Sequence, residues 1–258
     1  PNKSSSSGVI DLCGFLKDGY YFYQSQWTEK PMIHLFPHWN WKGKEGKVIQ
    51  VMAYTNCDSV ELFLNGKSFG IKALQFPRPG NSSAWNRYDV PPVNITTGDL
   101  HLIWDVPYEP GTLKAVGRKG GKIVAEEEIK TTGAPASIRL SVDKNTINAD
   151  QMDVAQIKIE VVDENGLVIP DADNLIQLKV EGAGKLIGFD NGNPADHTSM
   201  KSSERKTFNG LALAVVQSSN TEGKINITAI SPSLKGTSIE IVAEKVNKPI
   251  ATVESLKK

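Results

Sequence analysis

The sequence predicts an all-β protein made of two tandem β-sandwiches, and three observations support this. Short alternating hydrophobic stretches recur along the chain with turn-forming residues between them, at the spacing of about 8–12 residues that is typical of antiparallel sandwiches. Two of the turns, Asn65-Gly66 and Gly120-Gly121, are strong hairpin signals because both turn positions need a positive φ. A junction of small residues at 131–136 divides the strands into two groups.

One helix is expected, ahead of the strands. Asp18 can cap its start, and Tyr20, Tyr23, Gln24 and Trp27 then fall at helical spacing on one side. A stretch so rich in aromatic residues must pack on something, either the next module or a domain outside this chain. We treat residues 1–30 as one segment, and we interpret the start at Pro1, without Met, as a cut from a longer polypeptide.

The first group of strands occupies residues 31–132. A run at 48–54 is typical of a half-buried strand, and alternating residues at 60–64 lead into Asn65-Gly66. The residues at 113–116 and 123–125 flank the second hairpin turn. The proline-rich stretch 76–98 is predicted to be a loop with one short strand near 85–90.

The second group occupies residues 133–245. Strands are expected at 138–142, 154–162, 176–180, 211–216, 224–229 and 238–243. Residues 182–193 are rich in Gly and Asn, and residues 195–207 are expected to form a long polar loop. Residues 246–258 are predicted to be a frayed tail.

Charge and composition exclude several classes of function. The 29 basic and 29 acidic residues cancel, so nucleic acid and anionic membranes are not expected as partners. No apolar run reaches the roughly 20 residues of a membrane helix. Cys13 and Cys57 do not make a disulfide framework, and we expect them to be free and largely buried thiols. No cofactor is expected.

Several segments resemble bacterial family 2 glycoside hydrolases, and they follow one another in the same order. Residues 8–18 and the run Tyr-Tyr-Phe-Tyr-Gln-Ser-Gln-Trp at 20–27 resemble the end of the catalytic (β/α)8 barrel of that family. Residues 37–41 and 60–68 resemble an immunoglobulin-like domain, and residues 131–135 resemble its junction with the final domain. The segments 161–166, 180–184 and 190–194 resemble that final, invasin-type domain.

The resemblance implies a fold, a parent protein and a role. The fold would be two tandem immunoglobulin-like β-sandwiches preceded by a short remnant of a lost (β/α)8 barrel. The parent would be a retaining glycoside hydrolase of the β-galactosidase type, acting on a β-linked oligosaccharide and exported to the periplasm or cell surface. Its two catalytic glutamates would lie upstream, and no Asn-Glu dipeptide, which the acid/base would need, occurs here. The chain would therefore be a non-catalytic accessory region that supports the missing barrel, sets homo-oligomer contacts and shapes the outer substrate cleft.

Five residues are candidates for contact with substrate. His38, Trp39 and Trp41 lie in an aromatic segment that either lines the edge of a sugar cleft or is packed as an interdomain linker. No metal site is expected at His34 and His38, because an extended segment directs these two side chains differently.

The long polar loop supplies the other candidates. The loop carries four basic or potentially basic residues: His197, Lys201, Arg205 and Lys206. The loop either reaches the substrate or is a solvated or interdomain loop. If it reaches the substrate, His197 and Arg205 are the candidates for substrate contact. Asx residues in and near the loop could bind calcium, although they lack the spacing of a dedicated calcium loop and are ordinary turn formers; they are Asp171, Asp173, Asn174, Asp190, Asn191, Asn193 and Asp196.

A rival hypothesis is an independent carbohydrate-binding or adhesion module. Immunoglobulin-like modules serve many functions, so the fold alone cannot decide. A binding module should display an exposed aromatic platform, and all five tryptophans lie in the first 104 residues, with none in the last domain.

Overall fold

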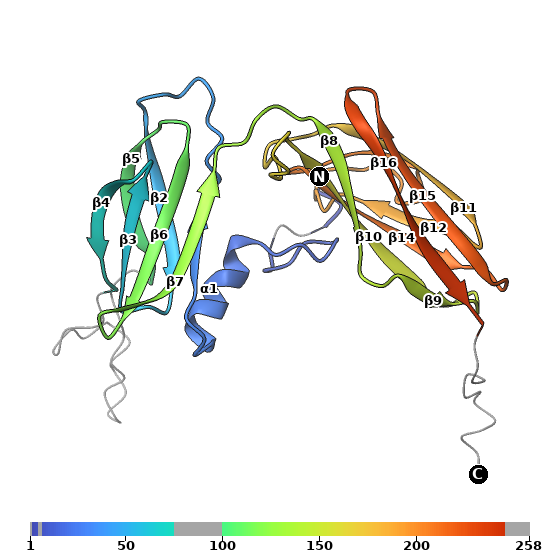
Figure 1. Cartoon of the computed structure of the whole chain (residues 1–258), viewed down its shortest axis with the longest axis horizontal. Coiled ribbons are helices and arrows are strands. Elements are labelled where there is room, and N and C mark those ends of the chain that lie inside the picture. The colour runs from blue at the N-terminus through green and yellow to red at the C-terminus, as the bar shows by residue number, and fades with distance from the viewer. Residues whose placement is uncertain (1, 5–6, 75–99, 246–258) are drawn as a thin grey trace, which may run out of the picture. The chain divides into compact units, whose positions relative to one another are not determined.

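The chain is all-β apart from one helix among the residues that the structure describes (Figure 1). The computed structural model describes residues 2–4, 7–74 and 100–245, so the short strand expected at 85–90 and the tail at 246–258 lie outside these residues. Two compact units result. We call Leu16–Thr131 the first sandwich, and Thr132–Lys258 together with Pro1–Phe15 the second sandwich.

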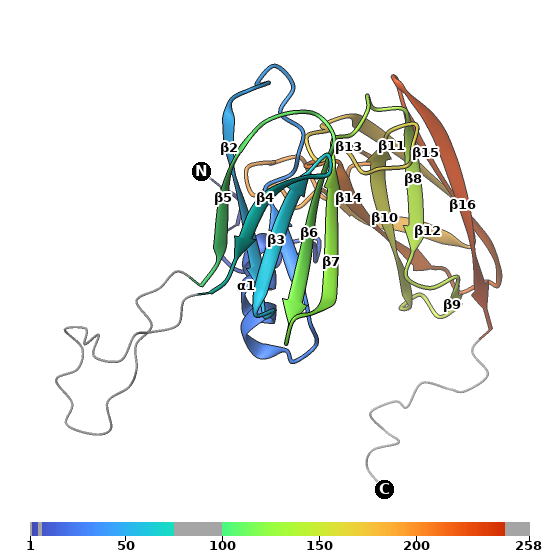
Figure 2. The same cartoon turned by 60° about the vertical axis from the view of Figure 1, so that its left-hand side comes forward.

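The first sandwich consists of a three-stranded sheet and a four-stranded sheet in its described residues. The strand orders are β1-β2-β5 and β4-β3-β6-β7, and Figure 2 shows β3, β6 and β7 running side by side. The elements are α1 (Asp18–Trp27), β1 (Ile33–Phe36), β2 (Val48–Thr55), β3 (Ser59–Leu64), β4 (Lys67–Lys72), β5 (Leu102–Pro107), β6 (Thr112–Lys119) and β7 (Lys122–Lys130).

The two sheets enclose a core that alternation along the strands had predicted. Val60, Leu62 and Leu64 on β3 are buried, and they face buried residues of β2 and β5 such as Val51 and Trp104. The predicted hairpin turn is confirmed, since Asn65 and Gly66 have φ values of 50° and 82°. The second predicted hairpin is present too, with Gly120 and Gly121 at 56° and 77°.

Helix α1 packs on the outer side of the three-stranded sheet. The packed face is opposite to the face of Tyr20, Tyr23, Gln24 and Trp27 that the sequence analysis identified. Phe22 meets the ring of Tyr54 at 5.3 Å between centroids, and Tyr21 stacks on His34 at 3.7 Å. Asp18 is the first helical residue and makes no capping hydrogen bond, so its predicted role as the cap is wrong. Its Oδ1 instead lies 2.8 Å from His34 Nε2, which ties the first turn of the helix to β1.

The second sandwich contains the remaining strands. Their hydrogen-bonded order is β12-β14-β10-β8-β16-β15-β11-β13, with β9 paired to β16. The bounds are β8 (Ser137–Val142), β9 (Thr146–Asn148), β10 (Val154–Val162), β11 (Leu175–Gly182), β12 (Gly184–Asp190), β13 (Glu204–Lys206), β14 (Leu211–Ser218), β15 (Gly223–Ser231) and β16 (Leu234–Glu244).

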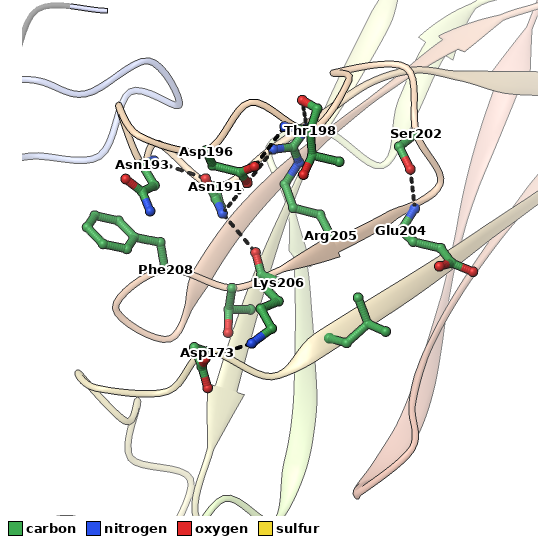
Figure 3. Close-up of a pocket in the computed structure, with 12 residues that line it drawn as sticks. Asp173, Asn191, Asn193, Asp196, Thr198, Ser202, Glu204, Arg205, Lys206 and Phe208 are labelled. Atoms are coloured by element: carbon green, nitrogen blue, oxygen red, sulfur yellow. Dashed lines mark hydrogen bonds and ion pairs between the residues drawn. The ribbon is translucent and has the colours of Figure 1, made fainter. Parts of the chain in front are cut away.

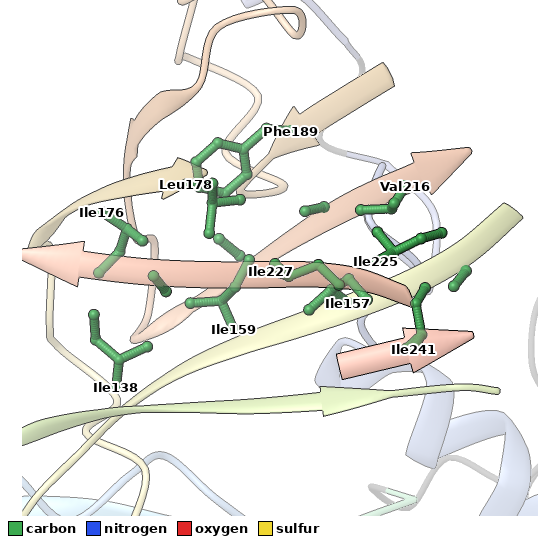
Figure 4. Close-up of a cluster of buried hydrophobic side chains, with 14 of the residues drawn as sticks. Ile138, Ile157, Ile159, Ile176, Leu178, Phe189, Val216, Ile225, Ile227 and Ile241 are labelled. Carbon is green, nitrogen blue, oxygen red and sulfur yellow. The ribbon is translucent and has the colours of Figure 1, made fainter. Parts of the chain in front are cut away.

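The second core is aliphatic and comes from both layers of strands. Ile157 and Ile159 of β10 face Ile225 and Ile227 of β15, and all four are fully buried (Figure 4). Phe189 closes the same cluster. Burial of this many branched side chains, at about 25 cal/mol for each Å² of apolar surface, is the main stabilising contribution to this unit.

A strap formed by residues 2–15 belongs to the second sandwich, although residues 1–30 had been expected to act as one segment. Lys3 Nζ bonds both carboxylate oxygens of Asp190, at 2.9 and 3.0 Å. The backbone N–H of Lys3 donates to the carbonyl of Pro194 at 2.7 Å. Cys13 is buried in the same unit, and burial raises the pKa of its thiol to about 12, which leaves it protonated and unreactive.

Some expectations of detail were incomplete, and others are confirmed. The stretches 182–193 and 195–207 contain strands β12 and β13, and β9 was not expected either. Both cysteines are free and buried, as predicted. Among the described residues no helix has the length and apolar character needed to cross a membrane.

Candidate functional site

Trp39 is a core residue of the first sandwich and not a sugar platform. Its side chain is completely buried, and its ring meets Tyr108 edge-on at 5.2 Å. The indole Nε1 donates to the carbonyl of Glu109 at 2.9 Å, and the Trp39 carbonyl accepts from Thr131 Oγ1 at 2.7 Å. With its ring and its polar groups all engaged, Trp39 anchors the start of the sandwich to its last residues.

Trp41 and His38 are half-buried and pair with each other. Their rings stack at 4.7 Å between centroids, and Trp41 Nε1 donates to the His38 carbonyl at 2.9 Å. The ammonium of Lys44 lies 4.5 Å from the centre of the Trp41 ring. The interpretation as a packed segment, which the sequence had left open beside the sugar-binding one, therefore describes these contacts better.

A polar pocket lies at one end of the second sandwich, between β11, β13 and the loop that precedes β13 (Figure 3). Its volume is about 440 Å³. The lining residues are Asp173, Leu175, Asn191, Asn193, Asp196, Thr198, Ser202, Glu204, Arg205, Lys206, Thr207 and Phe208. All of them come from the second sandwich, so the pocket is complete within that unit.

Arg205 organises the wall of this pocket. Its side chain is fully buried, and Nη1 bonds Asp196 at 2.6 Å and lies 3.4 Å from Asp190. Nη2 donates to the carbonyls of Thr198 and Ser199 at 2.9 and 3.0 Å. β13 positions this arginine, because Arg205 pairs with buried Ile176 in register and both side chains point inward.

The acidic side of the pocket is held ionised. Burial by itself raises the pKa of Asp196, but hydrogen bonds from the backbone and hydroxyl of Thr198 and the nearby guanidinium of Arg205 outweigh it. The net result lowers the pKa of Asp196 from 3.8 to about 2. Asn191 adds an amide hydrogen bond to Asp196 at 2.9 Å and a second one to the carbonyl of Lys206.

The structure brings some of the sequence candidates together and separates others. Asp173, Asn191, Asn193, Asp196, Arg205 and Lys206 line the pocket, whereas Asp171, Asn174, Asp190, His197 and Lys201 do not. Arg205 is too deeply buried to serve as the surface ligand that the sequence suggested, and it acts as the scaffold of the loop. His197 is exposed on the loop outside the pocket.

Three of the four carboxylates proposed for calcium are bound to cations of the chain itself. Asp173 pairs with Lys206 at 3.0 Å, Asp190 with Lys3 at 2.9 Å, and Asp196 with Arg205. In the part of the chain that the structure describes, no group of three or more His, Cys, Asp or Glu residues is arranged to hold a metal ion.

Sequence reasoning missed two residues that give the pocket its character. Phe208 is 36% exposed, and it stands just before the turn formed by Asn209 and Gly210, whose φ values are 53° and 73°. Glu204 is exposed and accepts a hydrogen bond from Gln177 at 2.8 Å. The signal that could have revealed Phe208 is an aromatic residue directly ahead of an Asn-Gly turn in a polar stretch.

Two domain families match the chain. Residues 138–240 match the family described as glycoside hydrolase family 2 C-terminal domain 5. Residues 46–125 match a domain of unknown function, DUF4982. The two matches fall within the second and the first sandwich, respectively.

Similar curated proteins are named as β-galactosidases and β-glucuronidases. The β-galactosidase BoGH2A of Bacteroides ovatus is 44% identical over 247 residues, which is 95% of this chain and 26% of that protein. A putative β-glucuronidase of Formosa agariphila is 41% identical over 205 residues, which is 79% of this chain and 18% of that protein. The chain thus spans about a quarter or less of the length of these relatives.

Solved structures agree with this. A β-glycosidase from Bacteroides vulgatus superposes with a TM-score of 0.81 at 38% identity, over 94% of this chain and 28% of that one. A family 2 glycosyl hydrolase from Bacteroides cellulosilyticus gives a TM-score of 0.80 at 31% identity, over 92% of this chain and 32% of that one. Together with the family matches, these likenesses identify the chain as the C-terminal region of a family 2 glycoside hydrolase.

Proposed function

We propose that this chain is the non-catalytic accessory region of a retaining glycoside hydrolase of the β-galactosidase type. It supports a catalytic domain that precedes it, contributes contacts between copies of the enzyme and borders the outer substrate cleft. A protein named β-galactosidase is 44% identical over 95% of this chain, and a putative β-glucuronidase is 41% identical over 79% of it, so the wider of the two matches supports the β-galactosidase type. The proposal places the parent in the periplasm or outside the cell.

The observation that carries the proposal is an apolar stripe on the outer side of α1, which we call the α1 stripe: Tyr20, Tyr23 and Trp27. These residues recur at the i, i+3 and i+7 spacing of one helix face. Trp27 is 80% exposed, and Tyr23 is 44% exposed. The opposite face already packs on the first sandwich, so this second apolar face fits a further protein surface.

The chemistry of the described carboxylates supports a non-catalytic role. Retaining hydrolysis needs one carboxylic acid and one carboxylate about 5–5.5 Å apart across the sugar. In the pocket, Asp196 is bound to Arg205 with a pKa of about 2, so it cannot serve as the acid. Asp173 is paired with Lys206 on the surface. The burial of Glu127 raises its pKa, but its carboxylate accepts the Leu35 N–H at 2.8 Å within the first sandwich.

Quenching of tryptophan fluorescence tests the docking role. Iodide should reach Trp27 in this chain, and it should be excluded from Trp27 in the full-length polypeptide if the preceding domain covers the α1 stripe. A Trp27→Phe variant of each form isolates the signal of this residue. Phe208→Ala is the matched control, because it removes an exposed aromatic ring from the other sandwich.

Either of two results would contradict the proposal. Equal quenching of Trp27 in both polypeptides would show that nothing covers the α1 stripe. Turnover of an aryl β-galactoside by this chain alone, above the rate of the blank, would show that the chain is not merely accessory.

A further inference from the structure

We propose that the polar pocket of the second sandwich binds a neutral saccharide. This goes beyond the docking role, because the pocket and the α1 stripe belong to different units. The volume of about 440 Å³ lies within the range of about 300–1,000 Å³ for small-molecule sites. A pocket at the lower end of that range accommodates one or two sugar rings.

The lining offers the groups that recognise a sugar ring. The hydroxyls of Thr198 and Ser202, the amide of Asn193 and the carboxylate of Glu204 can donate to or accept from sugar hydroxyls. Glu204 is exposed and has a second carboxylate oxygen beyond the one that Gln177 bonds. The exposed ring of Phe208 and the side chain of Leu175 supply an apolar surface for the C–H face of a pyranose.

The charges of the pocket favour a neutral ligand. Three carboxylates line it, those of Asp173, Asp196 and Glu204, against the two cations Arg205 and Lys206. Both cations are already paired, Arg205 with Asp196 and Lys206 with Asp173. An anionic sugar such as a uronate would therefore meet an excess of negative charge with no unpaired cation to neutralise it.

A second, independent observation points to a missing hydrogen-bond partner. Arg205 Nε is buried and has no acceptor among the described residues, although the other guanidinium nitrogens bond Asp196, Thr198 and Ser199. A buried donor without a partner is costly, so the residue that organises this wall leaves one hydrogen bond unmade. The polar wall thus has an unused donor at the residue that organises it.

Binding can be measured on this chain by ¹⁵N–¹H NMR and by calorimetry. Tryptophan fluorescence would not report it, because all five tryptophans lie within the first sandwich. Lactose and cellobiose are the neutral probes, and glucuronic acid is the anionic one. We expect either disaccharide to shift the amide signals of residues 191–208 in a saturable way, and glucuronic acid to bind more weakly.

Two variants assign the binding to the pocket. Phe208→Ala should weaken it about fivefold, since loss of one aromatic contact is worth about 1 kcal/mol. Glu204→Gln keeps the shape and removes the charge, and it should weaken binding as well. The matched controls are Trp27→Ala, in the other unit, and Glu181→Gln, which removes an equally exposed carboxylate outside the pocket. Both should bind as the parent chain does.

Three results would overturn the proposal. No saturable shift with either disaccharide would mean that the pocket takes no neutral saccharide. If both pocket variants remain folded, as judged by their NMR spectra, and still bind the disaccharide, the saccharide binds elsewhere. If Trp27→Ala loses binding, the saccharide binds on α1. Tighter binding of glucuronic acid would contradict the neutral ligand. None of these results bears on the quenching of Trp27, so the two proposals fail independently.

Discussion

Arg205 shows how one buried charge can hold a long loop in place. A fully buried guanidinium is tolerated only when it is paired and hydrogen-bonded, and here Asp196 and two backbone carbonyls satisfy most of it. The sequence identified Arg205 as a candidate because it stands in a long polar loop. It could not distinguish a ligand-binding arginine from a structural one, because that depends on whether the side chain points inward.

Substitution of Arg205 tests its structural role. Arg205→Met should destabilise the second sandwich by about 3–5 kcal/mol, because it leaves Asp196 and two carbonyls without their partner. Urea unfolding followed by circular dichroism measures the change. Lys206→Met, on the neighbouring exposed side chain, should cost no more than about 1 kcal/mol. An equal loss in both variants would contradict the assignment.

The lowered pKa of Asp196 predicts that the second sandwich loses stability at acidic pH. Its pKa is lowered to about 2 in the folded chain, so the stability that it contributes is complete above 3.8 and is lost as the pH falls toward 2. The pKa of other carboxylates, such as Asp163, is lowered too, so the effect must be measured as a difference between variants. Asp196→Asn should unfold with a shallower pH dependence than the parent chain between pH 4 and pH 2. Superimposable profiles would rule out the contribution of Asp196.

At the scale of elements, the signals that are local in sequence were read correctly. The Asn65-Gly66 hairpin was predicted because a two-residue turn fixes φ at its own positions, whatever the rest of the chain does. Strands β12 and β13 were missed because their pairing is distant: β12 pairs with β14, and β13 pairs with β11 across a long loop. β13 has only three residues, all polar, and glycines at 184 and 188 weaken the strand signal of β12.

Helix α1 shows the limit of periodicity. Its existence was predicted, but aromatic residues lie on two faces, and the spacing of residues cannot say which face meets the sandwich. The structure packs Tyr21 and Phe22 against β1 and β2 and leaves Tyr23 and Trp27 exposed. The sequence had emphasised the outward face.

Two substitutions separate these faces. Phe22→Ala should destabilise the first sandwich by roughly 1–2 kcal/mol, less than for a fully buried Phe, because its side chain is only partly buried. Trp27→Ala should change its stability by less than about 0.5 kcal/mol. The fluorescence of buried Trp39 and Trp104 reports the unfolding of this unit in both variants. A larger loss in Trp27→Ala would mean that the exposed face supports the helix in this chain.

For the whole molecule, the order of the chain does not match the order of its units. The strap at residues 2–15 precedes the first sandwich but packs on the second, through Lys3 and Asp190. Contacts between segments that are far apart in the sequence also explain why the pocket was only partly predicted. Its wall combines residues from three separated segments around 173, 191–198 and 202–208, and only the fold brings them together.

Removal of the strap should therefore destabilise the second sandwich, although the strap precedes the first sandwich in the sequence, and should leave the stability of the first sandwich unchanged. A chain that begins at Leu16 loses the ion pair from Lys3 and the buried side chain of Cys13, so the second sandwich should lose about 2–4 kcal/mol of unfolding free energy. All tryptophans and tyrosines belong to the first sandwich, so its unfolding can be followed by fluorescence while the amide signals of residues 137–244 report the second.

The single substitution Lys3→Met in the full chain should reproduce part of the loss, because Arg205, which lies farther away, is then the cation left beside Asp190 among the described residues. A shift of the fluorescence transition with unchanged amide signals would assign the strap to the first sandwich instead. The predicted result would mean that a segment preceding the first sandwich in the sequence stabilises the second sandwich.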